Sequence, residues 1–219
     1  MEKYTLQYAL NIVKNFDGWL SKEQAELIYD LVKSVPKDGS IVEIGSWAGK
    51  SMTVIVTATL EVKNNAEIYS IDPYLTSKDE SNNMYEKFVS NMKQIGYWDK
   101  IIQIKEKSHE FGINWKKPIS FIFIDGFHRY DVVKQDFELY FKHLLQNGIC
   151  ILHDVVSWYG PTKLSIELLE NRDDIEVIDL VGSALALRKV ELLTNEMKLK
   201  NMKIKEHLVD VINTQELKI

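Results

Sequence analysis

The sequence predicts an α/β fold built on a mostly parallel, doubly wound sheet with helices on both faces. Short apolar runs alternate with longer amphipathic stretches through the middle of the chain, which is typical of strands that each lead into a helix. The runs are strongly apolar, as expected of strands buried on both faces. Helical patterns before and after this region predict a helical lead-in and a helical tail.

The lead-in is predicted to contain two helices. Apolar residues recur at helical spacing over residues 6–16. A second helix opens at a capping box, residues 21–24, where Ser21 can accept from the backbone and Gln24 can reach back. The turn-forming residues 36–39 end this helix.

The alternating region begins directly after the lead-in. The expected strands are Ser40–Ile44, Ala66–Ile71, Ile101–Ile104, Ile119–Ile124 and Gly148–Leu152. The expected helices lie near Lys50–Leu60, Asn82–Ile95, Ser108–Trp115 and Asp131–Leu145. Because a helix follows each strand, neighbouring strands are expected to run parallel.

The end of the sheet is predicted to differ. A helix is expected over Lys163–Glu170, followed by strands at Ile175–Leu180 and Ala184–Leu187. Only residues 181–183 separate these two strands, and a turn that short joins antiparallel neighbours. The sheet is therefore expected to end in one reversed strand.

The chain is again helical, and rich in lysine, from Glu191 onward. We therefore expect residues 1–190 to form one domain and residues 191–219 to form a helical extension. This extension is expected either to form a homodimer contact or to pack on its own domain.

Composition argues against several classes of protein. With 219 residues, 45% hydrophobic and 27% charged, the chain has an ordinary globular balance. A formal net charge of −5 argues against a nucleic-acid partner. No apolar run approaches the roughly 20 residues that span a bilayer, and the first residues lack a signal-peptide pattern, so a cytoplasmic location without a membrane is expected. The single cysteine, Cys150, lies in an apolar run and is expected in the core.

The loop after the first strand is a candidate ligand site, because ligands of open α/β sheets bind at the carboxyl ends of the strands. Gly45 and Gly49 bracket a tight turn into a helix, and Gly45 would also let a ligand approach closely. Gly49-Lys50-Ser51 resembles the end of a phosphate-binding loop, but three residues separate the glycines where that motif has four. Dinucleotide-binding spacing is absent too, since Trp47 stands where its second glycine would be.

A third interpretation of this loop involves Glu43, which precedes the first glycine. An acid-x-Gly-x-x-x-Gly turn suits a ligand that has a ribose and a cationic amino-acid tail. The second strand ends at Asp72, whose carboxylate could accept hydrogen bonds from both ribose hydroxyls. Such a ligand would lie across the first two strands.

The same residues carry a resemblance to a known family. Val42-Glu43-Ile44-Gly45-Ser46-Trp47-Ala48-Gly49 resembles motif I of class I S-adenosylmethionine-dependent methyltransferases. Three further segments resemble a bacterial subgroup related to macrocin-type sugar O-methyltransferases. They are the lead-in Gly18-Trp19-Leu20-Ser21, the I-D-G-x-H-x-Y signature Ile124-Asp125-Gly126-Phe127-His128-Arg129-Tyr130, and the ending Leu144-Leu145-Gln146-Asn147-Gly148 with Ile151-Leu152-His153-Asp154-Val155. In that ending Asn147 replaces a glycine, and the resemblance covers roughly residues 18–188.

The resemblance implies a Rossmann-like, seven-stranded sheet with a reversed last strand, and S-adenosylmethionine as the cofactor. It implies that Glu43, Gly45 and Gly49 surround the methionine part and that Asp72 holds the ribose. Ser108 would lie near adenine, although a helix N-cap explains Ser108 equally well. The expected cofactor-binding residues are Glu43, Gly45, Ser46, Gly49, Asp72, Ser108 and Asp125.

Chemistry is expected where the fourth and fifth strands end. His128 is the candidate general base, with Asp125 beside it, because an unperturbed imidazole titrates near neutrality. The alternative is a histidine that only hydrogen-bonds its own loop. By resemblance, Asp125 and Asp154 match magnesium ligands of related sugar and catechol O-methyltransferases, although Val155 stands where those relatives have another acid or an amide. His153 is expected to be buried and hydrogen-bonded rather than a ligand.

The expected function is O-methylation of a small or carbohydrate-like acceptor with S-adenosylmethionine, aided by Mg²⁺ if the acidic pair binds it. The acceptor pocket would be roofed by the N-terminal helices and residues 156–161, where Trp158 and Tyr159 either stack on the acceptor or only pack. Two alternatives stay open. One is a nucleotide hydrolase that uses Gly45–Ser51, and the other is a cofactor-binding module without catalysis.

Overall fold

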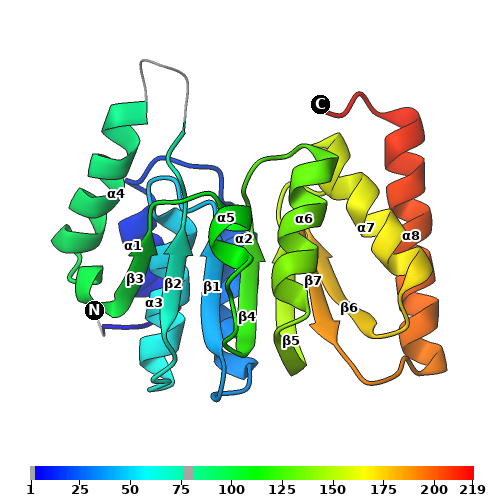
Figure 1. The fold of residues 1–219 in the computed structure, drawn as a ribbon, viewed down its shortest axis with the longest axis horizontal. Helices are drawn as coiled ribbons and strands as arrows, with labels where there is room; N and C mark the ends of the chain where they lie inside the picture. The colour runs from blue at the N-terminus through cyan, green and yellow to red at the C-terminus, as the bar shows by residue number, and fades with distance from the viewer. Residues whose placement is uncertain (1–2, 76–80) are drawn as a thin grey trace.

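A computed structural model describes residues 3–75 and 81–219, and it shows a sheet between two layers of helices (Figure 1). The strands are β1 (Ser40–Ile44), β2 (Ile68–Ile71), β3 (Ile101–Ile104), β4 (Ile119–Ile124), β5 (Leu144–Leu152), β6 (Ile175–Val181) and β7 (Ala184–Lys189). The helices are α1 (Leu6–Val13), α2 (Lys22–Ser34), α3 (Lys50–Glu61), α4 (Ser81–Gln94), α5 (Ser108–Gly112), α6 (Tyr130–Phe141), α7 (Tyr159–Asn171) and α8 (Asn195–Thr214), with a 3-10 helix, η1 (Trp98–Lys100), before β3.

The described residues form a seven-stranded sheet in the order β3-β2-β1-β4-β5-β7-β6. Strands β1 to β5 pair in parallel, whereas β7 is antiparallel to both β5 and β6. The prediction of a mostly parallel sheet with a reversed last strand is confirmed. The strand order reverses between β1 and β4, and in open α/β sheets ligands bind at such a switch point.

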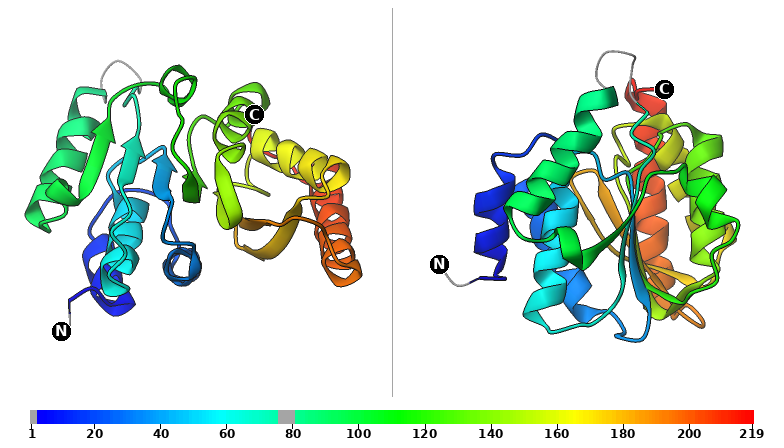
Figure 2. Two further views of the ribbon diagram at one scale, coloured as in Figure 1. Left: turned by 60° about the horizontal axis from the view of Figure 1, so that its bottom comes forward. Right: turned by 60° about the vertical axis from the view of Figure 1, so that its left-hand side comes forward.

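Successive residues of each central strand supply two separate cores, one on each face. Ile41 and Phe121 belong to the core under α1–α4, and Val42 and Ile122 belong to the core under α5–α8. The right-hand view of Figure 2 shows these helical layers on opposite sides of the sheet. Burial on both faces explains why these strands are apolar throughout.

Helix α2 begins as the sequence predicts. The Gln24 N–H donates to Ser21 Oγ at 3.2 Å, and the Ser21 N–H donates to Gln24 Oε1 at 2.9 Å. The capping box is therefore confirmed. Gln24 Nε2 also donates to Ser183 Oγ at 3.0 Å, which ties α2 to the turn between β6 and β7.

Strand β5 begins earlier than predicted. The periodicity predicts a helix as far as Leu145, but α6 ends at Phe141 and β5 starts at Leu144. The first residues of β5 form an irregularity, because the register against β4 shifts and Asn147 adopts a left-handed conformation with φ +62°. Pairing with β4 therefore outweighs the helical pattern of this stretch.

Helix α8 packs on α7 and β6 of its own chain. Its Asn201 is 3% exposed and faces the main chain of β6. Asn201 Nδ2 donates to the Ile175 carbonyl at 2.6 Å, and Asn201 Oδ1 accepts from the Val177 N–H at 2.8 Å. One side chain thus satisfies two main-chain groups of the edge strand.

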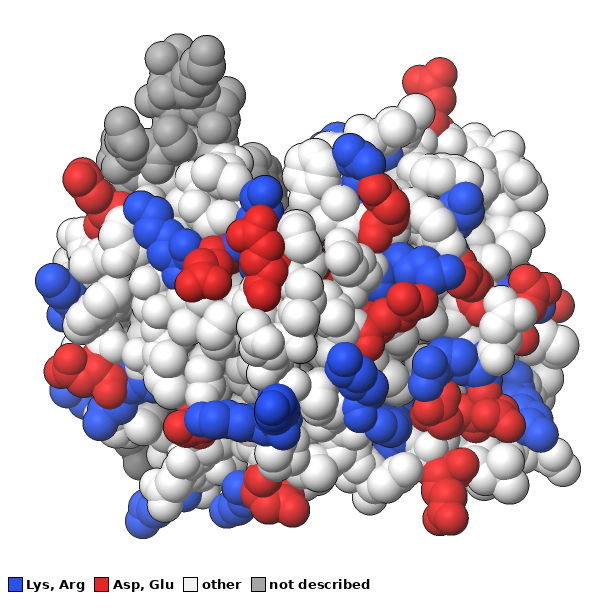
Figure 3. Space-filling model, in the orientation of Figure 1, with Lys and Arg blue, Asp and Glu red and all other residues white. Residues whose placement is uncertain are grey.

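The described residues include no helix that could span a membrane, and charges of both signs are mixed on one face of the molecule. No helix within residues 3–75 and 81–219 is long and apolar enough to cross a membrane. Figure 3 shows acidic and basic side chains interspersed over one face of the molecule. That face lacks the basic stripe that is typical of duplex-binding proteins.

Replacing Asn201 with alanine is expected to lower the free energy of unfolding by about 1–3 kcal/mol, because two buried main-chain groups lose their partner. Urea denaturation followed by circular dichroism measures the change. Asn213→Ala, at an exposed position of the same helix, is the control and should change the free energy by less than about 0.5 kcal/mol. Equal effects of the two substitutions would contradict this role for Asn201.

Candidate functional site

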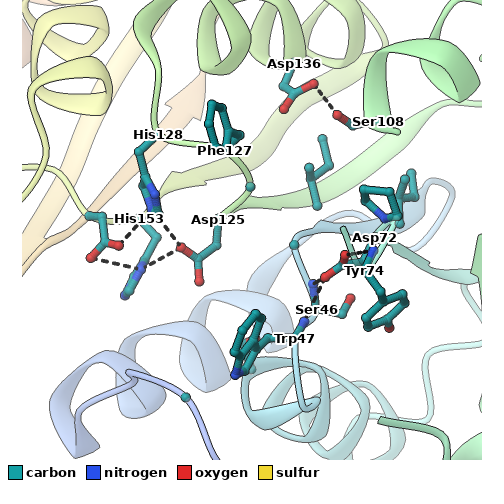
Figure 4. A pocket seen from close by; sticks show the side chains of 18 of the residues that line it. Ser46, Trp47, Asp72, Tyr74, Ser108, Asp125, Phe127, His128, Asp136 and His153 are labelled. Carbon is teal, nitrogen blue, oxygen red and sulfur yellow. Dashed lines mark hydrogen bonds and ion pairs between the residues drawn. The ribbon is translucent and has the colours of Figure 1, made fainter. Parts of the chain in front are cut away.

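A cavity of about 710 Å³ lies at the carboxyl ends of β1, β2, β4 and β5, around the switch point. A concave site of this size suits a small ligand or a cofactor. The predicted site residues that line it are Gly45, Ser46, Asp72, Ser108, Asp125, His128 and Asp154. Figure 4 shows Ser46 and Asp72 on one side of the cavity and Asp125, His128 and His153 on the other.

Asp72 holds the loop after β1. Its Oδ2 atom accepts from the Ser46 and Trp47 N–H groups, each at 2.9 Å, and its Oδ1 atom accepts from the Tyr74 N–H at 2.6 Å. Burial raises the pKa of Asp72 above its ordinary value, and these N–H donors only partly oppose that effect. The carboxylate that was expected to take both ribose hydroxyls is therefore largely occupied by backbone, and a limited acceptor capacity remains for a ligand.

The phosphate-binding interpretation of this loop does not fit its hydrogen bonds. A phosphate-binding loop needs free N–H groups, but those of Ser46 and Trp47 already donate to a carboxylate. The lysine of the Gly-Lys-Ser sequence is also committed, since Lys50 Nζ donates to the Gly18 carbonyl at 2.8 Å. The N–H groups of this loop bind the Asp72 carboxylate of the same chain instead of a phosphate.

Both glycines of the loop have a left-handed backbone conformation that side chains rarely adopt, and Gly45 is also required by packing. Gly45 has φ +86°, and a Cβ there would lie 2.0 Å from the Asp125 carbonyl oxygen. Gly49 has φ +88°, and a Cβ there would lie 2.5 Å from the Met92 side chain of α4. The absence of a Cβ at Gly45 thus makes room for the end of β4, and Gly45 also lines the cavity. Gly49 does not line the cavity among the described residues.

Glu43 lies beneath the loop and does not reach the part of the cavity that the described residues define. It is fully buried, and neither carboxyl oxygen has a hydrogen-bond partner among the described residues. The Ser46 hydroxyl is close but pairs with Ser70 Oγ at 2.7 Å. Burial, reinforced by the charges of Asp125 and Asp72, raises the pKa of Glu43 to about 8. Glu43 is therefore mainly neutral at pH 7.

Ser108 is the first residue of α5, and the helix N-cap is Lys107. The N-cap interpretation of Ser108 is therefore wrong. Its hydroxyl instead donates to Asp136 Oδ1 at 2.5 Å. Asp136, on α6, is 1% exposed, lines the cavity, and has a pKa raised to about 6 by burial. Asp136 is not predicted from the sequence pattern as a site residue, although its place on the apolar side of α6, beside Phe137, is a signal for one.

A cluster of four ionisable residues forms where β4 and β5 end. Asp125 and His153 extend these neighbouring strands, and His153 Nδ1 lies 2.9 Å from Asp125 Oδ1. His128 Nε2 lies 2.9 Å from Asp154 Oδ2, as a close ion pair without hydrogen-bond geometry, and 3.9 Å from Asp125 Oδ1. His153 is buried and paired, as expected. His128 contacts a carboxylate from the next strand end.

The two carboxylates decide the protonation of His128. Burial alone would lower its pKa, but Asp125 and Asp154 outweigh burial and raise it to about 9. The pKa of His153 is raised for the same reason, while that of Asp154 is lowered, burial being outweighed by the neighbouring histidines. His128 is therefore a cation at pH 7 in this arrangement. His128 was expected to titrate near neutrality, and this expectation is corrected, because its pKa lies well above 7.

The cluster offers a set of donors that suits a divalent cation. One ligand atom each from Asp125, His128 and Asp154 lies within 4.8 Å of the others. Two carboxylates and an imidazole are common ligands of divalent metals. The next residue, Val155, is fully buried in the core, so it supplies no ligand in place of the acid or amide of related enzymes.

Trp158 stacks on His128, with ring centroids 4.4 Å apart and planes at 11°. Neither Trp158 nor Tyr159 is among the described residues that line the cavity. Of the two roles left open for Trp158, packing is the one observed. Trp19 and Phe127 instead stand at the cavity, 83% and 64% exposed.

The buried position of Glu43 predicts a pH dependence of stability. Its pKa rises from 4.5 to about 8 on folding, so the folded state holds an extra proton between those values. The free energy of unfolding should therefore fall with rising pH in this window, by up to about 1.4 kcal/mol per pH unit from this group. Glu43→Gln should flatten the curve measured by urea denaturation, whereas the exposed Glu138→Gln should not. Equal slopes for the Glu43→Gln variant and the native protein would contradict the assignment.

Several known proteins are similar to this chain. A curated relative, the uncharacterized protein R132 of Acanthamoeba polyphaga mimivirus, is 27% identical over 157 residues, which is 68% of this chain. The match spans 66% of that relative's length, slightly under two thirds.

Solved structures with the same fold include three methyltransferases. The SAH-bound Podospora anserina methyltransferase PaMTH1 matches with a TM-score of 0.65 and 17% identity over 87% of this chain and 89% of its own. The O-methyltransferase TomG of Streptomyces achromogenes, in complex with SAM, matches at 0.63 and 18% over 87% and 91%. CalS11, a TDP-rhamnose 3'-O-methyltransferase, matches at 0.56 and 15% over 84% and 92%.

A family model described as a methyltransferase domain matches residues 42–155, more than half of the chain. The matched part runs from β1 to the end of the acid and histidine cluster, so it contains both walls of the cavity. Because the family model covers more than half of the chain, the chain belongs to this methyltransferase family.

Proposed function

We propose that this protein transfers the methyl group of S-adenosylmethionine to a hydroxyl oxygen of a small, carbohydrate-like acceptor. One observation carries the proposal. A single cavity has a loop clasped by Asp72 on one side and a cluster of two carboxylates and two histidines on the other. The first side suits a bound nucleoside and the second suits proton transfer, at the strand ends where such folds bind ligands.

The cofactor is proposed to lie across β1 and β2. Ser108 and Asp136 form a buried polar pair that can meet a polar base, and the remaining acceptor capacity of Asp72 can meet a ribose hydroxyl. A sulfonium cation bound in the cavity would have the acidic side chains of Asp72 and Asp125 near it, because both residues line the cavity. Such surroundings favour a cationic methyl donor.

The acceptor is proposed to bind beside the cluster. In the reaction, the acceptor oxygen would form a bond to the methyl carbon while the carbon–sulfur bond breaks and its electron pair stays on sulfur, which gives S-adenosylhomocysteine. The hydroxyl proton would pass to the unprotonated His128 imidazole. Alignment of the two reactants supplies most of the rate, and a general base adds about 10²–10⁴-fold. His128 can serve as that base only after it loses its own proton, which the two carboxylates hold at neutral pH.

A divalent cation would change this proton balance. Asp125 and Asp154 would hold it through carboxylate oxygens, with His128 beside them, and the proposed ion is Mg²⁺. When bound, such a cation lowers the pKa of an acceptor hydroxyl. Its positive charge would also compensate the negative charges of the two carboxylates, as protonated His128 does when no cation is bound.

A carbohydrate-like acceptor is supported by two features. The sequence resembles sugar O-methyltransferases along the His128 segment, and CalS11, which shares the fold, acts on TDP-rhamnose. The exposed rings of Trp19 and Phe127 at the cavity can pack against the apolar face of a sugar ring.

Methyl transfer from labelled S-adenosylmethionine to methyl glycosides, free sugars and catechol tests the proposal. We expect label on a sugar hydroxyl. His128→Asn should lower the rate by about 10²–10⁴-fold, because it removes the proposed base. Asp154→Asn should also lower the rate, because it removes the ion-pair partner of His128 and a ligand of the proposed cation. The affinity for S-adenosylhomocysteine, measured by calorimetry, should stay within a few-fold in both variants. His207→Asn, on the exposed side of α8, is the control.

The outcomes separate the alternatives. Binding of S-adenosylhomocysteine without transfer to any acceptor would favour a non-catalytic module. Hydrolysis of ATP that depends on Lys50 would favour the hydrolase. Loss of activity in EDTA and recovery with Mg²⁺ would support the metal site, and unchanged activity in EDTA would contradict it.

A further inference from the structure

The segment after α8, residues 215–219, is bonded along the loop that follows β5. We call it the strap. Lys218 forms a parallel β-bridge with Trp158. The Tyr159 N–H donates to the Lys218 carbonyl at 2.8 Å, and the Lys218 N–H donates to the Ser157 carbonyl at 3.2 Å. Figure 1 shows the chain turning back from the end of α8 toward α7. The attachment is therefore made by main-chain groups.

The residues held by the strap contact His128 in two ways. The Trp158 ring stacks on the imidazole at 4.4 Å. Gly160, in the first turn of α7, packs against the backbone of the same residue, and a Cβ on Gly160 would lie 2.0 Å from the His128 carbonyl oxygen. Residues 158–160 thus contact both the side chain and the main chain of His128. Among the described residues, His128 lines the cavity, whereas Trp158 and Gly160 do not.

The loop between the cluster and the strap has a strained backbone. Asp154 has φ +58° and Val156 has φ +68°, and a β-branched residue rarely adopts this conformation. Such a conformation persists only when the surroundings hold it. Thr162 Oγ1 accepts from the Val156 N–H at 3.0 Å, and the Asp154 carbonyl accepts from the Trp158 N–H at 2.9 Å. The two main-chain bonds of the strap are further restraints on the same loop.

We propose that the strap is a positioning element, which holds Trp158 against His128 and so fixes the imidazole beside Asp154. Trp158 is then a positioning residue that acts through His128 from outside the cavity. The effect on methyl transfer rests on the proposed function, whereas the stacking contact and its dependence on the strap do not. The Lys218 ammonium, 5.4 Å from the Trp158 ring, is dispensable because the bonds are made by the backbone.

Nuclear magnetic resonance of the imidazole protons of His128 tests the strap directly. An imidazole stacked on an indole has ring protons shifted upfield by the ring current, and His128→Asn identifies the signal. Deletion of residues 215–219 should abolish most of this shift. Deletion of Ile219 alone, which is 99% exposed, and Lys218→Met should both retain it. An unchanged shift after deletion of the whole strap would overturn the proposal.

The catalytic consequence has its own readout. Strap deletion should lower kcat by on the order of tenfold, because a small displacement of a reacting group is costly. The affinity for S-adenosylhomocysteine should stay within twofold, which also shows that the variant is folded. Trp158→Phe should retain most of the native kcat, whereas Trp158→Leu should behave like the deletion. A Trp158→Leu variant with native kcat would overturn the positioning role.

A further substitution, at Gly160, tests the contact with the main chain of His128. Gly160→Ala places a methyl group against the His128 carbonyl, so it should alter the His128 signal while the strap is intact. If no acceptor is ever methylated, the proposed function fails, but the ring-current measurements still decide whether the strap positions His128. Failure of one proposal is thus distinguishable from failure of the other.

Discussion

The rest of the site depends on one interaction, the carboxylate of Asp72 at the end of β2 accepting the Ser46 and Trp47 N–H groups of the loop after β1. Hydrogen bonds to a charged acceptor contribute about 1.5–3 kcal/mol each, more than neutral ones. They fix the turn in which Gly45 lies against the Asp125 carbonyl. The position of this loop is therefore linked to the end of β4, from which the acid and histidine cluster projects. A substitution of Asp72 should therefore shift residues on both sides of the cavity, the loop after β1 and the cluster at the end of β4.

The charges of the site are arranged in two zones. Near the loop, burial raises the pKa of both Glu43 and Asp72. Near β5, the two histidines supply positive charge to Asp125 and Asp154. A cationic methyl donor fits the first zone, and a proton or a divalent cation fits the second. Both zones share Asp125, which lies between the loop and the histidines.

The fold was readable from the sequence because burial on both faces makes the central strands apolar, and a short turn reveals the reversed strand. The start of β5 was not readable, since Leu144 continues a helical pattern and only pairing with β4 makes it a strand. Within the site, the residues at strand ends were predictable from position. The contacts of Asp136 and Trp158 were not, because each depends on a residue distant in the chain, Ser108 and His128 respectively. Local pattern also cannot tell that the Glu43 carboxyl oxygens have no hydrogen-bond partner within residues 3–75 and 81–219.

The most direct test of the Asp72 clasp is amide hydrogen exchange at Ser46 and Trp47 in the ligand-free protein. Both amides should be protected, and in Asp72→Asn and Asp72→Ala they should exchange progressively faster, while amides within β4 keep their protection. Exchange of Ser46 and Trp47 at the rate of an open loop in the native protein would contradict the clasp. So would protection that is unchanged in Asp72→Ala, because the loop would then be held by something other than this carboxylate.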